Sequence, residues 1–130
     1  MKIISTDTAP KPGGHYSQAV VHDNVVYIAG QLPFDPETGG KILSSIEEQT
    51  ERVLKNIEAI LIAAGSSKNH VLKTTVFITD IDHWSKVNTV YEEFFGSHKP
   101  ARAIVPVATL HHGFLVEIDA VAAVGSKESN

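Results

Sequence analysis

The sequence predicts one α+β domain, residues 1–130, built from a β-sheet and two helices. Short segments rich in β-branched and aromatic residues alternate with two longer segments whose apolar residues recur at helical spacing. Turn-forming residues separate these segments, and no linker, repeat or low-complexity stretch divides the chain. The expected order of elements is β-β-β-α-β-α-β-β.

A hairpin is the first element with clear signals. Strands are expected at 19–22 and 25–30, joined by the turn residues Asp23 and Asn24. Segment 32–40 is rich in proline, glycine and acidic residues, so it should form a surface loop.

The first helix has recognisable ends. Either Ser44 or Ser45 caps it, because Glu47 and Glu48 then lie in the first turn, where the helix dipole favours negative charge. An apolar stripe follows at i, i+3, i+4 spacing, and Gly65 ends the helix.

The second half of the chain predicts a strand, a helix and two more strands. A β-branched strand at 71–79 precedes the helix, which starts at Asp80 or Asp82 and ends at Gly96. The final strands are expected at about 101–108 and 115–124, followed by a polar, disordered end from residue 125.

Several strands are apolar on both faces. Segments 25–28, 76–78 and 116–122 do not alternate between apolar and polar residues, which predicts that both sheet faces are buried. Two helices cover only about one face of such a sheet. We therefore expect another subunit to cover the second face, with sites at the subunit junctions.

The composition excludes several classes of function. Eleven basic residues against fifteen acidic ones give a net charge of −4, the opposite of the balance typical of nucleic-acid binders. No segment is apolar for long enough to be a signal peptide or a membrane span. The chain has no cysteine, which is compatible with the cytoplasm, our expected location.

Arg102 is the strongest candidate for a functional residue. It lies in an otherwise apolar strand, where a charged guanidinium needs a partner. One interpretation is an internal salt bridge to Glu117 or Asp119. The other is bidentate capture of a ligand carboxylate or phosphate, for which the planar guanidinium is suited.

Three further polar residues interrupt apolar surroundings. Glu117 lies within a strand where burial would raise its pKa toward the range useful for proton transfer, although acidic residues on an exposed strand face are common. Tyr16 follows a flexible Gly-Gly segment that could bring its phenol to a pocket or simply pack at an edge. Asn88 lies among apolar residues of the second helix and could equally tie that helix to a loop.

The sequence predicts a site without a metal or cofactor. The seven histidines show no metal-ligand spacing, and His111 and His112 are adjacent. Dinucleotide-binding, P-loop and hydrolase-elbow motifs do not occur.

These segments resemble the Rid family of reactive-intermediate deaminases, also called the YjgF or L-PSP family. The most specific match is Pro100-Ala101-Arg102 together with the later Val116-Glu117-Ile118. The likeness covers nearly the whole chain, in order, at residues 9–19, 29–33, 49–50, 54–57, 71–78, 87–95, 99–102 and 116–118.

The resemblance implies a fold, an assembly and a reaction. The fold would be chorismate-mutase-like, with a mixed sheet and two helices on one face, and the assembly a homotrimer with ligand sites between subunits. The reaction would be hydrolysis of a small enamine or imine carboxylate, such as 2-aminoacrylate, to a 2-keto acid and ammonia. Two alternatives stay open: a binding or regulatory protein for small carboxylates, and an endoribonuclease, which the acidic balance disfavours.

The resemblance also assigns roles. Arg102 would bind the substrate carboxylate, Glu117 would activate water, and Tyr16 would shape the site or donate a hydrogen bond to it. Asn88 would lie near the pocket, and the backbone of Gly30 would border it.

Several positions depart from the family pattern. Deaminating members commonly read Ala-Arg-Ser-Cys-Val-Glu-Val-Ala-Arg-Leu where this chain has residues 101–110, so Ile104, Pro106 and Thr109 replace a cysteine, a glutamate and an arginine. Ala29 stands where a serine is frequent in the substrate site, and His15 where a proline is usual. A bulkier and drier substrate site, bordered by Ile104, is the expected consequence.

Overall fold

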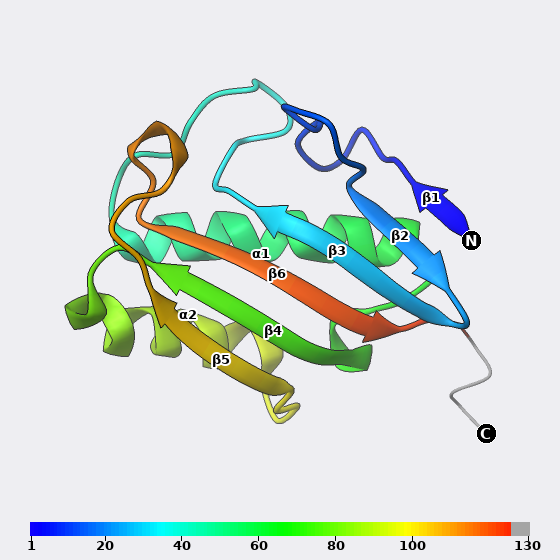
Figure 1. Cartoon of the computed structure of the whole chain (residues 1–130). Coiled ribbons are helices and arrows are strands. Elements are labelled where there is room, and N and C mark those ends of the chain that lie inside the picture. The colour runs from blue at the N-terminus through cyan, green and yellow to red at the C-terminus, as the bar shows by residue number, and fades with distance from the viewer. Residues whose placement is uncertain (126–130) are drawn as a thin grey trace.

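A six-stranded sheet and two helices make up the part of the chain that the computed structural model describes, residues 1–125 (Figure 1). The segment expected to be disordered begins at residue 125, and residues 126–130 of it lie outside the described residues. The order is the one that the sequence predicts: β1 (Lys2–Ile4), β2 (Ala19–His22), β3 (Val25–Gln31), α1 (Ile46–Ala63), β4 (Val71–Ile78), α2 (Trp84–Phe95), β5 (Ala101–Pro106) and β6 (Val116–Ala123).

The strands lie in the order β1-β2-β3-β6-β4-β5, so the last strand of the chain inserts into the middle of the sheet. All pairs are antiparallel except β4 and β5, which run parallel and make the sheet mixed. The β2–β3 hairpin forms because Asp23 and Asn24 adopt left-handed backbone angles, with φ of 50° and 62°, which these two residue types tolerate well.

The helix ends follow local rules. Ser45, rather than Ser44, caps α1 by accepting a hydrogen bond from the Glu48 N–H at 3.2 Å. Gly65 follows the helix in the left-handed region, with φ of 78°. Asp80 begins a 3₁₀ turn over Ile81–His83, by accepting from the Asp82 N–H, and α2 itself starts only at Trp84.

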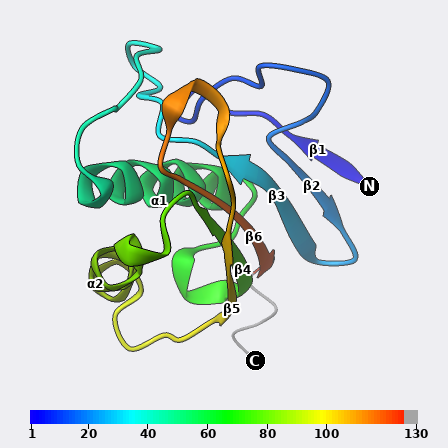
Figure 2. The same cartoon turned by 60° about the vertical axis from the view of Figure 1, so that its left-hand side comes forward.

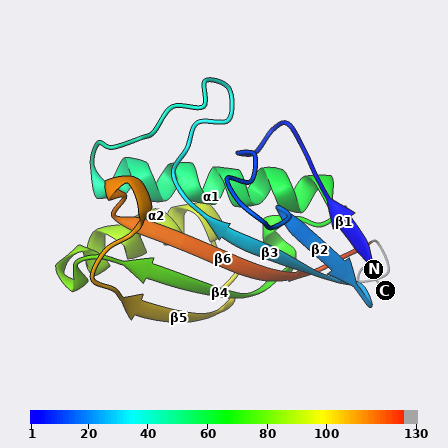
Figure 3. The same cartoon turned by 45° about the horizontal axis from the view of Figure 1, so that its top comes forward.

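Both helices cover the same face of the sheet, as Figures 2 and 3 show. Side chains at the centre of this face are fully buried, among them Val26, Val76 and Ile118. The opposite face, here called the open face, carries alternate residues of the same strands. Tyr27 is 50% exposed there and Ile3 is 62% exposed. Residues 1–125 of one chain therefore bury one of the two faces that the sequence predicts to be buried.

No helix within residues 1–125 is long and apolar enough to cross a membrane. The segment with His111 and His112, expected as a loop, folds as a 3₁₀ turn, η3 (His111–Gly113). The expected strand at 101–108 ends at Pro106.

Candidate active site

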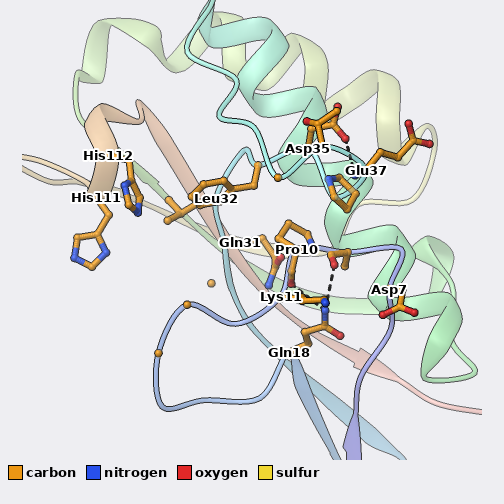
Figure 4. A pocket seen from close by; sticks show the side chains of 18 of the residues that line it. Asp7, Pro10, Lys11, Gln18, Gln31, Leu32, Asp35, Glu37, His111 and His112 are labelled. Atoms are coloured by element: carbon orange, nitrogen blue, oxygen red, sulfur yellow. Dashed lines mark hydrogen bonds between the residues drawn. The ribbon is translucent and has the colours of Figure 1, made fainter.

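A cavity of about 720 Å³ opens where three loops meet at one end of the sheet. The loops are the segment before β2, the segment after β3, and η3 before β6. They converge because β2 and β6 start, and β3 ends, at the same end of the antiparallel sheet. Figure 4 shows His111 and His112 on one side of the cavity and Asp35 and Glu37 on the other.

A buried glutamine fixes the first loop. Gln18 is 3% exposed, and its amide oxygen accepts from the Thr6 N–H at 2.7 Å. Its amide nitrogen donates to the Thr6 and Pro10 carbonyls, at 3.0 and 2.9 Å. The Gln18 side chain thus supplies the hydrogen bonds that the backbone of this irregular segment lacks. It thereby holds the part of the cavity wall that leads to Tyr16.

Two buried amides of α1 fix the other loops. Asn56 donates to the Leu32 and Phe34 carbonyls, at 3.2 and 2.9 Å. Gln49 accepts from the Leu115 N–H at 2.9 Å and so holds the segment that follows η3. Both amides are at most 1% exposed. The sequence interpretation missed these residues, although amides inside an apolar helical stripe signal a specific partner.

Gly30 leaves room for the Glu117 side chain beside this cavity. The Glu117 carboxylate occupies the space where a side chain at position 30 would begin, with its Cδ atom 3.1 Å from that point. Only glycine therefore permits this carboxylate position. Burial raises the pKa of Glu117, and Asp119 adds to the rise, whereas the charge of His111 lowers it.

Tyr16 lines the same cavity, and Ala29 precedes Gly30 in β3. The Tyr16 hydroxyl accepts from the Gly13 N–H at 3.2 Å, and the residue is 52% exposed. The backbone groups of Ala29 are hydrogen-bonded within the chain: its N–H donates to the Gln18 carbonyl, and its carbonyl accepts from the Gln31 side-chain amide.

Arg102 lies on the helix-covered side of the sheet. It pairs with Thr74 across β4–β5, and its guanidinium lies 4.6 Å from the Trp84 ring centroid and 4.7 Å from that of Tyr91. One guanidinium nitrogen, Nη1, donates to the Asn88 Oδ1 at 3.0 Å. Two aromatic faces and one amide therefore hold the guanidinium in place.

The internal salt bridge considered for Arg102 does not form. No carboxylate within residues 1–125 lies within 4.0 Å of its guanidinium. Asp119 lies on the open face and accepts from the Thr75 N–H at 3.2 Å. A second cavity, of about 430 Å³, is lined by Arg102, Asn88 and the end of α2.

The sequence-predicted site residues thus fall into two groups within one chain. Tyr16 and Gly30 line the first cavity, with Glu117 against Gly30, whereas Arg102 and Asn88 line the second. Arg102 in β5 pairs with Thr74 of β4, and Glu117 in β6 pairs with Phe77 of β4. Two strand spacings across the sheet and three residues along β4 therefore separate Arg102 from Glu117. Their Cα atoms are roughly 14 Å apart, and their side chains lie on opposite faces.

Two of the three departures near Arg102 lie in its strand, β5. Ile104 pairs with Val76 and packs against the core, and it lines neither cavity. Pro106 ends β5 opposite Ile78, and exposed Thr109 lies between β5 and η3. His, Asp and Glu side chains within the described residues make no cluster of three or more that could hold a metal ion.

The sequence profile of the endoribonuclease L-PSP family matches residues 6–124. The chain belongs to the Rid (YjgF/L-PSP) family. Among its Rid relatives, a RutC family protein of Pyrococcus abyssi is 49% identical over 121 residues, covering 93% of this chain and 95% of that protein. The human 2-iminobutanoate/2-iminopropanoate deaminase is 44% identical over 124 residues, covering 95% of this chain and 90% of the human protein.

Solved Rid structures share the fold. The crystal structure of Escherichia coli TdcF with bound serine superposes with a TM-score of 0.91 at 38% identity. The match covers 96% of this chain and 100% of TdcF. The α+β fold with a mixed sheet, which the resemblance implied, is therefore confirmed.

Proposed function

We propose that this Rid protein hydrolyses small enamine or imine carboxylates, of the 2-aminoacrylate and 2-iminopropanoate type, to a 2-keto acid and ammonia. The observation that carries this proposal is the Arg102 guanidinium, fixed by two aromatic rings and Asn88 with no carboxylate partner in residues 1–125. A positioned guanidinium suits bidentate capture of a carboxylate. Relatives named deaminases, and a relative solved with serine, a small carboxylate, support the same ligand class.

The complete site forms between subunits of a homotrimer. In one chain Arg102 lies far from Glu117, and its strand, β5, is an edge strand of the sheet. The open face exposes apolar side chains that a second copy would cover. In a closed ring of three, the Arg102 edge of one subunit would meet the cavity of the next, where Tyr16, Gly30 and Glu117 lie.

The chemistry needs few groups. The imine carbon is already electrophilic, so orientation of the substrate and one proton acceptor for water can suffice. Arg102 would hold the carboxylate and Glu117 would take a proton from the attacking water. The raised pKa of Glu117 makes its carboxylate a stronger base than an exposed one, and Tyr16 would donate a hydrogen bond at the cavity.

Ammonia release from an imine generated in the assay tests this proposal. The Arg102→Ala variant should lose on the order of 100-fold or more in kcat/KM, because it loses a charge-assisted carboxylate contact. Lys86→Ala, which removes an exposed positive charge from the same helix that holds Arg102, is the matched control and should be unaffected. Equal rates for Arg102→Ala and wild type would refute the mechanism.

Glu117→Gln separates catalysis from simple ligand binding. Turnover should be lost in this variant and kept in Asp119→Asn, a neighbouring carboxyl on the same face. A non-catalytic binding protein would instead keep its ligand affinity and function in Glu117→Gln. The family profile is described as an endoribonuclease, so RNA cleavage by a nuclease-free preparation is the second activity to measure. The net charge of −4 predicts that none will be seen.

A further inference from the structure

Two histidines of η3, His111 and His112, line the first cavity and lie on the same side of it (Figure 4). His112 is fixed by aromatic contacts: its ring lies edge-to-face on Phe34, at 5.3 Å between centroids, and on Phe114, at 5.8 Å. Its backbone adopts φ of 62°, which turns the chain sharply and leaves the neighbouring His111 ring 5.8 Å away, at the cavity. Both imidazoles are exposed, but the His112 ring contacts two phenylalanine rings, whereas the aromatic neighbour of His111 within residues 1–125 is His112 itself.

His111 interacts with Glu117 through space. Its charge is the largest influence that lowers the pKa of Glu117, against the larger rise that burial causes. No hydrogen bond or ion pair joins the two side chains within residues 1–125. The two groups are thus close enough to interact but not in contact. Such a pair can act on one substrate from two positions.

Other charged groups face His111 across the same cavity. Lys11 lines it from the first loop, and Asp35 and Glu37 line it from the loop after β3. Asp7 and Tyr16 also line the cavity, and Asp7 lies on the side opposite the two histidines (Figure 4). The acidic groups at this cavity thus outnumber Lys11.

We propose that His111 is a second catalytic residue, the proton donor that complements Glu117, in the deaminase reaction on which this inference rests. Water adds its oxygen to the imine carbon while the C=N π pair moves to nitrogen. Protonated His111 gives that nitrogen a proton and Glu117 takes one from the water. The C–N bond of the resulting carbinolamine then breaks. Glu117 returns its proton to the departing ammonia, and His111 takes the hydroxyl proton as the keto group forms.

This cycle starts with Glu117 ionised and His111 protonated, which predicts a bell-shaped pH profile for kcat/KM. The acidic limb belongs to the Glu117 carboxyl. The alkaline limb belongs to an imidazole, the side chain that changes charge near neutral pH.

The test compares the pH profiles of wild type, His111→Asn and His112→Asn, with the imine-generating enzyme in excess at every pH. Asparagine suits the left-handed backbone at position 112, so the two variants are matched. The His111→Asn variant should lose on the order of 100-fold in kcat/KM near pH 6 and should lack the alkaline limb. His112→Asn should keep the wild-type profile. His111→Gln serves as a second variant, and thermal unfolding checks that each protein is folded.

The outcomes separate this inference from the proposed function. A wild type that turns over imines, with an unchanged alkaline limb in His111→Asn and His111→Gln, overturns the role of His111 and leaves the deaminase proposal intact. Equal losses in the His111 and His112 variants also overturn it, because the turn would then matter only as structure. A wild type without turnover overturns the deaminase proposal and this inference with it.

Discussion

Replacing Gly30 with alanine should abolish most activity while the protein stays folded. The added methyl carbon would lie 3.1 Å from the Glu117 Cδ and 3.4 Å from its Cγ, with a carboxylate oxygen closer still. Ordinary contacts between carbon atoms are about 3.5–4.0 Å, so the carboxylate has to move by about 1 Å. Glu117 can do so because only the end of its flexible side chain is displaced.

The size of both effects follows from this displacement. An off-rotamer side chain costs about 0.5–1.5 kcal/mol, so the free energy of unfolding should fall by no more than that. A catalytic group misplaced by about 1 Å can lower the rate on the order of 100-fold, and kcat/KM should fall accordingly.

Ammonia release gives kcat/KM, and urea unfolding gives the stability. Gly13→Ala is the matched control, because Gly13 also lines the cavity but a methyl group there meets no atom within 4 Å. Full activity in Gly30→Ala would refute the role given to this contact, and so would an equal loss in Gly13→Ala.

Three further substitutions test the hydrogen bonds of Asn56 to the loop after β3, the buried carboxyl of Glu117 and the open face. Asn56→Ala leaves two loop carbonyls without a buried donor, so it should lower the free energy of unfolding by about 2–4 kcal/mol. The control Asn69→Ala removes an exposed amide and should lower it by almost nothing. Equal urea midpoints for the two variants would contradict this prediction. Burial raises the pKa of Glu117, so the folded state holds its proton more tightly than the unfolded chain, and stability falls as pH rises through the raised pKa. The Glu117→Gln variant should therefore have a higher free energy of unfolding than wild type at pH 8 and a smaller advantage at pH 4. Urea unfolding that shows no advantage at pH 8 would contradict this prediction. Tyr27→Glu should convert the proposed trimer to monomers, as measured by light scattering, and should abolish activity. Ile62→Glu, on the outside of α1, should do neither. A trimeric Tyr27→Glu variant would mean that the open face is not the interface.

Local sequence signals predict much of the fold. Asp23-Asn24 predicts the hairpin turn, and Ser44 or Ser45 together with Gly65 predicts the ends of α1, because these features depend on a few neighbouring residues; the structure selects Ser45. The insertion of β6 between β3 and β4 depends on contacts far apart in the chain, and no local pattern encodes it. The family resemblance, rather than periodicity, supplied the arrangement of the sheet.

The candidate site was predicted only in part. The sequence singled out Arg102 and Glu117 as isolated charges in apolar strands, but not the faces on which they lie. Those faces are set by register with β4, where Arg102 pairs opposite Thr74 and Glu117 opposite Phe77. The salt bridge considered between them fails for this reason, and the aromatic rings that hold Arg102 come from α2 instead. Gln18, Gln49 and Asn56 were missed because their partners are backbone groups of distant loops.

Mixing two inactive variants tests most directly whether one subunit supplies Arg102 and its neighbour supplies Glu117. Arg102→Ala and Glu117→Gln subunits, each inactive alone, would be co-expressed and purified as mixed trimers. In a ring of heterologous contacts, about a quarter of the junctions pair an intact Arg102 with an intact Glu117, so about a quarter of wild-type activity should return. Mixed trimers as inactive as the two parent variants would contradict a site shared between subunits.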